Sequence, residues 1–280
     1  LILCEKLYPV VIMHGINHGK DHTEKMKQWV LDSIPGVEVI NCEVGQGKIS
    51  TIFMNLMDQI DELSACINND KRTKNGFVGL GVSQGGFLMR AYLQYYNNQK
   101  NPMKRFVGLA PPVGGYYCGN LSICNEFYLP EFINEIVHEL VYSDFIQNLV
   151  GPAGYWRDPY QVENYVNSKI ILTELDNLNY INMTLKDNFM SVDKIVLFGS
   201  EDDGLISPWC STQFCQWAGD DNTTVSMENR PDYQEDRFGL KTMNTQGRIL
   251  RLKGINHHQY NHDETFFKKN VVQYLKIYDE

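Results

Sequence analysis

The stretch that decides the fold is FVGLGVSQGG, residues 77–86. An apolar run from Phe77 to Leu80 enters the turn Gly81-Val82-Ser83-Gln84-Gly85, and helical spacing resumes from Leu88 to Tyr95. A buried strand that passes through a glycine-rich turn into a helix is typical of a parallel sheet. Because the turn follows the end of the strand, it lies at the carboxyl edge of the sheet, where such folds place their sites.

Other apolar runs on both sides of this stretch predict further buried strands. They cover Tyr8–Met13, Val37–Ile40, Arg105–Leu109, Lys194–Gly199 and Arg248–Lys253. Helical spacing is found at Trp29–Ile34, Ile52–Leu63 and Thr265–Ile277. This alternation predicts an α/β fold with a mainly parallel, doubly wound central sheet flanked by helices.

The alternation stops between Pro111 and Asp193. Apolar residues recur there at helical spacing over 132–141 and 145–150, and the only segment with any strand character is 169–172. We therefore expect a single domain over residues 1–280 with a helical, lid-like insertion over 111–193. Its apolar stripes either pack the insertion onto the sheet or wall a groove, and Trp156 is the best single candidate for a groove residue.

Composition excludes several classes of protein. The 280 residues are 43% hydrophobic and 21% charged, and the net charge of −9 comes without a basic patch, which disfavours a nucleic-acid partner. No run of apolar residues is long enough for a transmembrane segment. Two Gly-Lys pairs, at 47–48 and 19–20, lack phosphate-loop spacing, and no G-x-G-x-x-G follows the first strand. We expect no cofactor.

The turn at Ser83 fits the G-x-S-x-G pattern of a nucleophilic serine between a strand and a helix, although a capping serine in a glycine-rich turn would look similar. A serine hydroxyl needs a base, and the base needs an orienting carboxylate. Acidic residues follow the strand at 194–199, and histidines follow the strand at 248–253. This is the chain order Ser, acid, His of serine hydrolases.

Each of the two clusters offers alternatives. Glu201, Asp202 and Asp203 compete as the acid, and we choose Asp203 because it stands at the turn before Gly204. The base is His257, His258 or His262; the last two have the i,i+4 spacing of metal ligands, but no HExxH glutamate accompanies them, so no metal is expected.

Acyl transfer also needs two donors for the oxyanion. The backbone amide of Gln84, directly after the serine, is one, and the amide of Ile16, in the loop after the first strand, is assigned as the second. His14, in the same loop, is interpreted as a loop histidine.

Seven cysteines include two close pairs, Cys118 with Cys124 and Cys210 with Cys215. Cys4, Cys42 and Cys66 are scattered, and no CxxC spacing indicates a zinc site. N-x-S/T sequons stand at Asn120, Asn182 and Asn222, which is weak support for secretion. The opening residues 1–3 are either the tail of a signal peptide or the approach to the first strand.

Motifs along nearly the whole chain resemble those of the palmitoyl-protein thioesterase family of α/β-hydrolases. They are VVIMHGI (10–16), GVSQGG (81–86), YSDFIQ (142–147), GYWRDP (154–159), DDGLISPW (202–209), FGLKTM (238–243) and GINHHQ (254–259). The resemblance implies the α/β-hydrolase fold, with Ser83 as nucleophile, Asp203 as orienting acid and His257 as base. It also implies a Cys118–Cys124 disulfide, glycosylation and a lysosomal or secreted location with the signal peptide removed. Cys66 resembles half of a family disulfide, but the expected partner region, 95–99, has no cysteine.

The function that follows is hydrolysis of long-chain acyl thioesters, with S-acylated proteins or peptides, or acyl-CoA, as partners. A carboxylesterase or lipase acting on oxygen esters would use the same triad, and a non-catalytic acyl-binding protein on the same scaffold is the more distant alternative.

Overall fold

The computed structural model describes residues 7–97, 100–118, 140–220 and 222–278. Six strands form one sheet in the order β2-β1-β3-β4-β5-β8, and every neighbouring pair is parallel. The strands are β1 (Val10–Met13), β2 (Val39–Cys42), β3 (Phe77–Val82), β4 (Met103–Leu109), β5 (Ile195–Gly199) and β8 (Ile249–Lys253). All six lie where the sequence predicts them within a few residues, so the predicted parallel α/β fold is confirmed.

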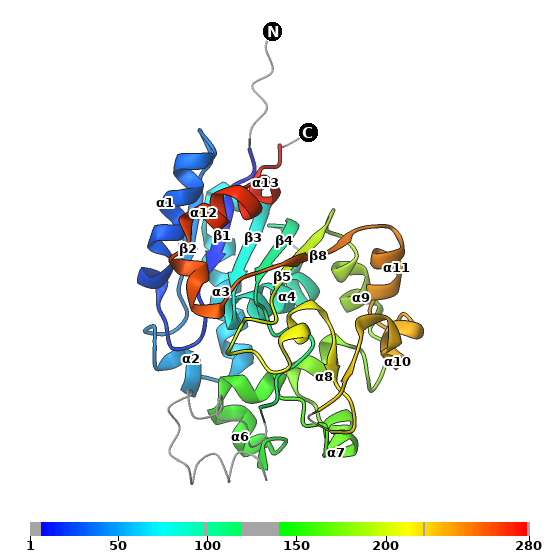
Figure 1. Cartoon of the computed structure of the whole chain (residues 1–280). Helices are drawn as coiled ribbons and strands as arrows, with labels where there is room; N and C mark the ends of the chain where they lie inside the picture. Colours follow the sequence, from blue (N-terminus) through cyan, green and yellow to red (C-terminus); the bar gives the residue numbers. More distant parts are fainter. Residues whose placement is uncertain (1–6, 98–99, 119–139, 221, 279–280) are drawn as a thin grey trace.

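Helices pack around the sheet (Figure 1). Those outside the insertion are α1 (Glu24–Ser33), α2 (Ser50–Phe53), α3 (Leu56–Asn69), α4 (Gln84–Tyr96), α10 (Pro231–Gln234), α11 (Leu240–Thr245), α12 (Glu264–Phe266) and α13 (Val272–Leu275). The helix predicted over 52–63 is two helices, because the Asn55 side chain accepts the Met57 amide and starts α3. A π-helical turn, Phe267–Val271, separates α12 from α13.

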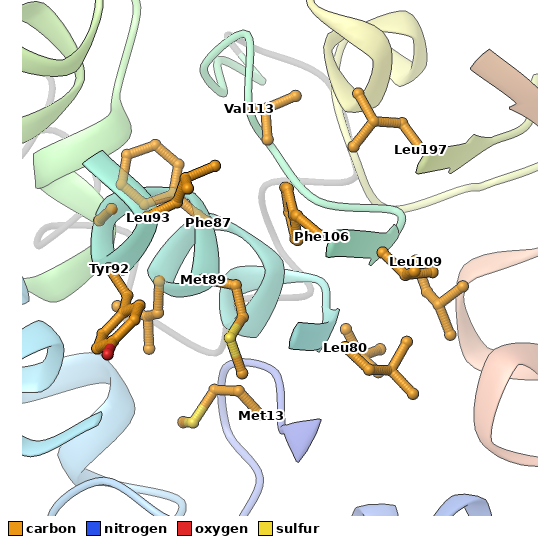
Figure 2. Packing of buried hydrophobic residues seen from close by; sticks show 14 of the residues in the cluster. Met13, Leu80, Phe87, Met89, Tyr92, Leu93, Phe106, Leu109, Val113 and Leu197 are labelled. Atoms are coloured by element: carbon orange, nitrogen blue, oxygen red, sulfur yellow. The ribbon is translucent and has the colours of Figure 1, made fainter. Parts of the chain in front are cut away.

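One part of the hydrophobic core lies between the sheet and α4, the helix that follows Ser83. Strand β1 is buried along its whole length, as expected for a parallel strand covered on both faces. Figure 2 shows Met89 of α4 pointing toward Met13 of β1, with Leu80 of β3 nearby. This packing fixes the start of α4 against the carboxyl ends of the central strands.

The insertion contains short helices in its described part. They are α6 (Asp144–Leu149), α7 (Val162–Asn167), α8 (Ile171–Leu175) and α9 (Met183–Phe189). Figure 1 shows α6, α7 and α8 together at the end of the sheet away from α13. The strand character expected at 169–172 is wrong: Leu172 and Leu175 are buried at helical spacing in α8, and the Thr173 hydroxyl bonds back to the Ile170 carbonyl. The stripe over 132–141 lies mostly outside the described residues.

A two-stranded antiparallel pair, β6 (Gln216–Trp217) with β7 (Thr224–Val225), was not anticipated from the sequence. Within the described ranges, every helix is too short or too polar to cross a membrane.

Candidate active site

Ser83 stands in the turn between β3 and α4 with a backbone φ of 53°. A positive φ is rare for a residue with a side chain, and strain of this kind concentrates at functional sites. The turn holds it from both sides: the Ser83 amide donates to the Leu109 carbonyl at 2.8 Å, and the Gly86 amide donates to the Ser83 carbonyl at 2.9 Å. The tight turn needs Gly85, where a Cβ would stand 2.3 Å from the Met13 carbonyl oxygen.

Asp203 follows β5 and is completely buried. One of its carboxylate oxygens, Oδ1, accepts the backbone amides of Leu205 at 3.1 Å and Ile206 at 2.7 Å. Glu201 and Asp202, the competing acids of the sequence analysis, are exposed. The turn after β5 therefore orients Asp203 inward and leaves its two neighbours in solvent.

His257 follows β8 and meets Asp203. Its ring Nδ1 lies 3.1 Å from Oδ1 and 3.0 Å from Oδ2 of Asp203, and its backbone amide donates to the Asp203 carbonyl at 2.9 Å. The structure thus brings together the acid and the base that the sequence analysis selected. His258 and His262, the competing bases, are exposed.

Ser83, His257 and Ile16 line one pocket of about 110 Å³. Gly15 lies against the serine, since a Cβ there would stand 3.1 Å from the Ser83 Cβ. Within the described residues no hydrogen bond joins the Ser83 hydroxyl to the imidazole of His257. Catalytic contacts of this type are often loose until substrate binds.

The two expected oxyanion donors belong to the loop after β1 and to the first turn of α4. Ile16 belongs to the loop after β1 and lines the pocket. Gln84 is the first residue of α4, and the first amides of a helix have no acceptor within the helix. The arrangement can therefore offer two backbone N–H groups to an anion beside Ser83.

Comparisons with known proteins bear directly on this arrangement. Residues 9–258 match the family model described as palmitoyl protein thioesterase. The chain belongs to this family. Palmitoyl-protein thioesterase 1 of Caenorhabditis elegans is 33% identical over 257 residues, covering 87% of this chain and 84% of that protein. Palmitoyl-protein thioesterase 3 of Dictyostelium discoideum is 31% identical over 244 residues, covering 86% and 82%.

More distant relatives agree. Lysosomal thioesterase PPT2 of Homo sapiens is 26% identical over 272 residues, covering 95% of this chain and 87% of that protein. Among solved structures, a monoacylglycerol lipase of Paleococcus ferrophilus superposes with a TM-score of 0.52 at 14% identity, covering 95% of this chain and 93% of that one. The fold is therefore that of the α/β hydrolases, and family membership supports a hydrolase of the thioesterase class.

Four further histidines surround the pocket of this thioesterase family member: His18, His22, His258 and His262. The rings of His18 and His22 stack with centroids 3.5 Å apart. Burial, followed by the neighbouring His22, lowers the pKa of His18 to about 4, and burial also lowers the pKa of His22. Among the residues that the structure describes, no three His, Cys, Asp or Glu side chains are arranged to hold a metal ion.

Trp156 is not among the residues that line the serine pocket. It is 8% exposed and packs edge-on against Tyr116 and Tyr117, with ring centroids 5.8 and 5.5 Å apart. Its assignment to an acyl groove stays a prediction.

Two disulfides are present in the described part of this family member. Cys210–Cys215 confirms the pairing suggested by spacing. Cys42–Cys66, which joins β2 to α3, was missed, since the two cysteines are 24 residues apart and only the sheet brings them together. Cys118 is disulfide-bonded, whereas Cys124 lies outside the described residues.

A group of buried polar side chains around Gln84 was not anticipated from the sequence. The Gln84 side-chain amide donates to the Gln59 side chain and to the Thr51 carbonyl, both at 2.9 Å. The Tyr155 hydroxyl donates to the Gln84 side-chain oxygen at 2.7 Å. No sequence motif marks these residues, because they come from three separate segments.

Proposed function

We propose that this chain is a serine hydrolase that removes long-chain fatty acyl groups from cysteine thiols through Ser83, His257 and Asp203. The observation that carries the proposal is the bonded His257–Asp203 pair beside the pocket that holds Ser83 in its positive-φ turn. A carboxylate that holds one ring nitrogen leaves the other free to accept a proton from a serine hydroxyl. The family membership supports thioesters as the substrates of this site.

The reaction proceeds in two acyl transfers. His257 Nε2 takes the hydroxyl proton as Ser83 Oγ bonds to the thioester carbonyl carbon, and the carbonyl oxygen becomes an oxyanion. The backbone amides of Ile16 and Gln84 stabilise that oxyanion. The carbon–sulfur bond then breaks, and the departing sulfur takes the proton from His257. Water, deprotonated by the same imidazole, releases the fatty acid and restores the serine.

A long acyl chain needs an apolar groove, since each buried methylene contributes about 0.8 kcal/mol. We assign this role to the insertion over 111–193, acting as a lid within a single hydrolase domain, with Trp156 as one of its contacts. S-acylated proteins or peptides, or acyl-CoA, are the partners that this site would accept.

The names of several relatives bear on the cellular location of the protein. Several are named lysosomal thioesterases, and we propose a lysosomal or secreted location for this chain on that basis. The disulfides agree with an oxidising compartment. Two sequon residues, Asn182 and Asn222, are at least partly exposed, and we expect them to carry glycans.

The deciding experiment measures hydrolysis of palmitoyl-CoA and of a palmitoyl oxygen ester by the parent chain and by Ser83→Ala. We expect thioester cleavage by the parent and its near-complete loss in the folded variant. Cleavage of the oxygen ester alone would indicate an esterase or lipase. Equal turnover by both chains would overturn the assignment of Ser83, and acyl binding without turnover would indicate a binding protein.

A further inference from the structure

Thr51 lies at the start of α2, outside the triad, and is 1% exposed. Its hydroxyl oxygen accepts the backbone amide of Asn17 at 2.7 Å and donates its own proton to the Lys48 carbonyl at 2.6 Å. Asn17 is the residue after Ile16. The threonine therefore anchors the loop that carries one of the two proposed oxyanion donors.

The same threonine also contacts the second donor's residue. Its carbonyl accepts the side-chain amide of Gln84 at 2.9 Å. Gln59 fixes this carbonyl further by donating to it at 3.2 Å, and Tyr155 holds the other end of the Gln84 carboxamide. One residue of α2 is thus bonded to the residue after Ile16 through its hydroxyl and to Gln84 through its carbonyl.

The hydroxyl contact matters because the loop is strained at the residue it holds. Asn17 has a φ of 56°, in the left-handed region that residues with side chains adopt rarely. Such a conformation persists only when its surroundings fix it. The bond from the Asn17 amide to Thr51 fixes the peptide plane that directly follows Ile16, and hence the direction in which the loop leaves that residue.

We propose that Thr51 is a positioning residue that sets the spacing of the Ile16 and Gln84 amides around the oxyanion. This inference rests on the proposed function, which assigns those two amides to the transition state. Oxyanion donors act only if they stand at hydrogen-bond distance from where the charge develops. A shift of the Ile16 loop would therefore slow the chemical step and leave binding of the acyl chain intact.

Thr51→Val tests this, because valine keeps the shape of threonine, removes the acceptor for Asn17 and leaves the backbone contact to Gln84 in place. We expect kcat to fall by about tenfold, which is less than the roughly 10²- to 10³-fold loss caused by removing an oxyanion donor altogether. KM should change by less than about twofold. Thr51→Ser, which keeps the hydroxyl, should retain most of the activity.

Thr73, which follows α3 and does not line the pocket, offers a matched control. It is also completely buried, its hydroxyl donates to the Ile67 and Asp70 carbonyls at 2.7 and 2.8 Å, and it accepts the Asn101 side-chain amide at 2.6 Å. Thr73→Val should lower stability to a similar extent as Thr51→Val and leave kcat unchanged. If both variants lose kcat alike, Thr51 acts only through stability and the proposal is overturned.

A fluorophosphonate that labels the serine separates this proposal from the proposed function, since its phosphonyl oxygen needs the same two donors whatever the natural substrate. Slower labelling of Thr51→Val than of the parent and of Thr73→Val would support Thr51 as a positioning residue even if no thioester is cleaved. Labelling at the parental rate would overturn it, and a parent not labelled at Ser83 would overturn both proposals. Should Thr51→Val fail to fold, Thr51→Ala is measured in the same way.

Discussion

His257 is tied to Asp203 at two points, through its backbone amide at 2.9 Å and through its ring Nδ1 at 3.0 Å. The carboxylate accepts the ring N–H, so the proton of the neutral imidazole stands on Nδ1 and Nε2 remains an acceptor. The two loops after β5 and β8 are thereby locked together at the carboxyl edge of the sheet. The orientation of His257, the proposed base, is thus set by the fold before any substrate binds.

Asp203→Asn should reduce kcat by about 10³- to 10⁴-fold, because an amide can present its own N–H to the ring and favour the wrong tautomer. Thioester turnover by the purified variant checks this, with circular dichroism to establish that it is folded. Asp202→Asn is the control, since Asp202 is adjacent and exposed and should keep parental activity. A large loss in Asp202→Asn with little change in Asp203→Asn would reverse the choice of acid.

The strands and the serine turn could be predicted from the sequence because their signals are local. The run from Phe77 to Leu80 and the glycines around Ser83 are adjacent in the chain, and packing requires them there. Selection of Asp203 and His257 within their clusters rested on turn position and on the family resemblance. The structure supplies what the sequence could not: which carboxylate is buried and which is in solvent.

The supporting contacts could not be predicted, because they join segments that only the fold brings together. Thr51 meets Asn17 across 34 residues and Gln84 across 33. The residues next to Thr51 in the sequence do not indicate that it contacts these two distant segments. The pairing of Cys42 with Cys66 was missed for the same reason: each cysteine looks isolated until β2 and α3 pack.

The loss of one charge from the buried ion network that includes Arg90 of α4 should lower the stability of the protein. Asp176 is 1% exposed and bonds the guanidinium groups of Arg90, on α4, and Arg230. Asp176→Asn removes the buried carboxylate that pairs with Arg90 and leaves Arg230 only its second acidic partner, Asp232, so it should lower the free energy of unfolding by about 3–5 kcal/mol. Urea unfolding measures this. Glu264→Gln, which removes the exposed pair with Lys268, should leave the midpoint unchanged, and an equal effect of both substitutions would contradict the argument.

The disulfide between β2 and α3 should matter more for stability than the local one. Cys42–Cys66 closes a loop of 24 residues, so replacing both cysteines by serine should cost about 3 kcal/mol of unfolding free energy by loop entropy. Cys210–Cys215 closes a loop of 5, for which the same argument gives about 2 kcal/mol. Unfolding midpoints of the two double variants, measured side by side, test the order. The reverse order would show that local strain or packing outweighs loop length.

Stability should also fall on acidification because of His18. Its pKa is lowered from 6.5 to about 4 by burial first, then by His22, His14 and Lys48, with Asp21 acting in the opposite direction. Between these two values the unfolded chain binds a proton that the folded chain does not, so unfolding becomes easier as the pH falls from 6.5 toward 4. His18→Gln removes this proton uptake and should lose less stability than the parent between about pH 7 and about pH 5, as urea midpoints at the two values will show.

The control for His18→Gln is the substitution of an exposed histidine that lines the same pocket. His258→Gln provides it, since that side chain also lines the pocket but stands in solvent. It should retain the parental loss of stability on acidification. If His18→Gln loses as much as the parent, the ring is protonated in the folded protein without penalty, and its burial does not keep it neutral. Should the prediction hold, His18 adds no positive charge beside Ser83 until well below the ordinary pKa of histidine, so it would not contribute charge to an oxyanion held by the proposed donors, the backbone amides of Ile16 and Gln84.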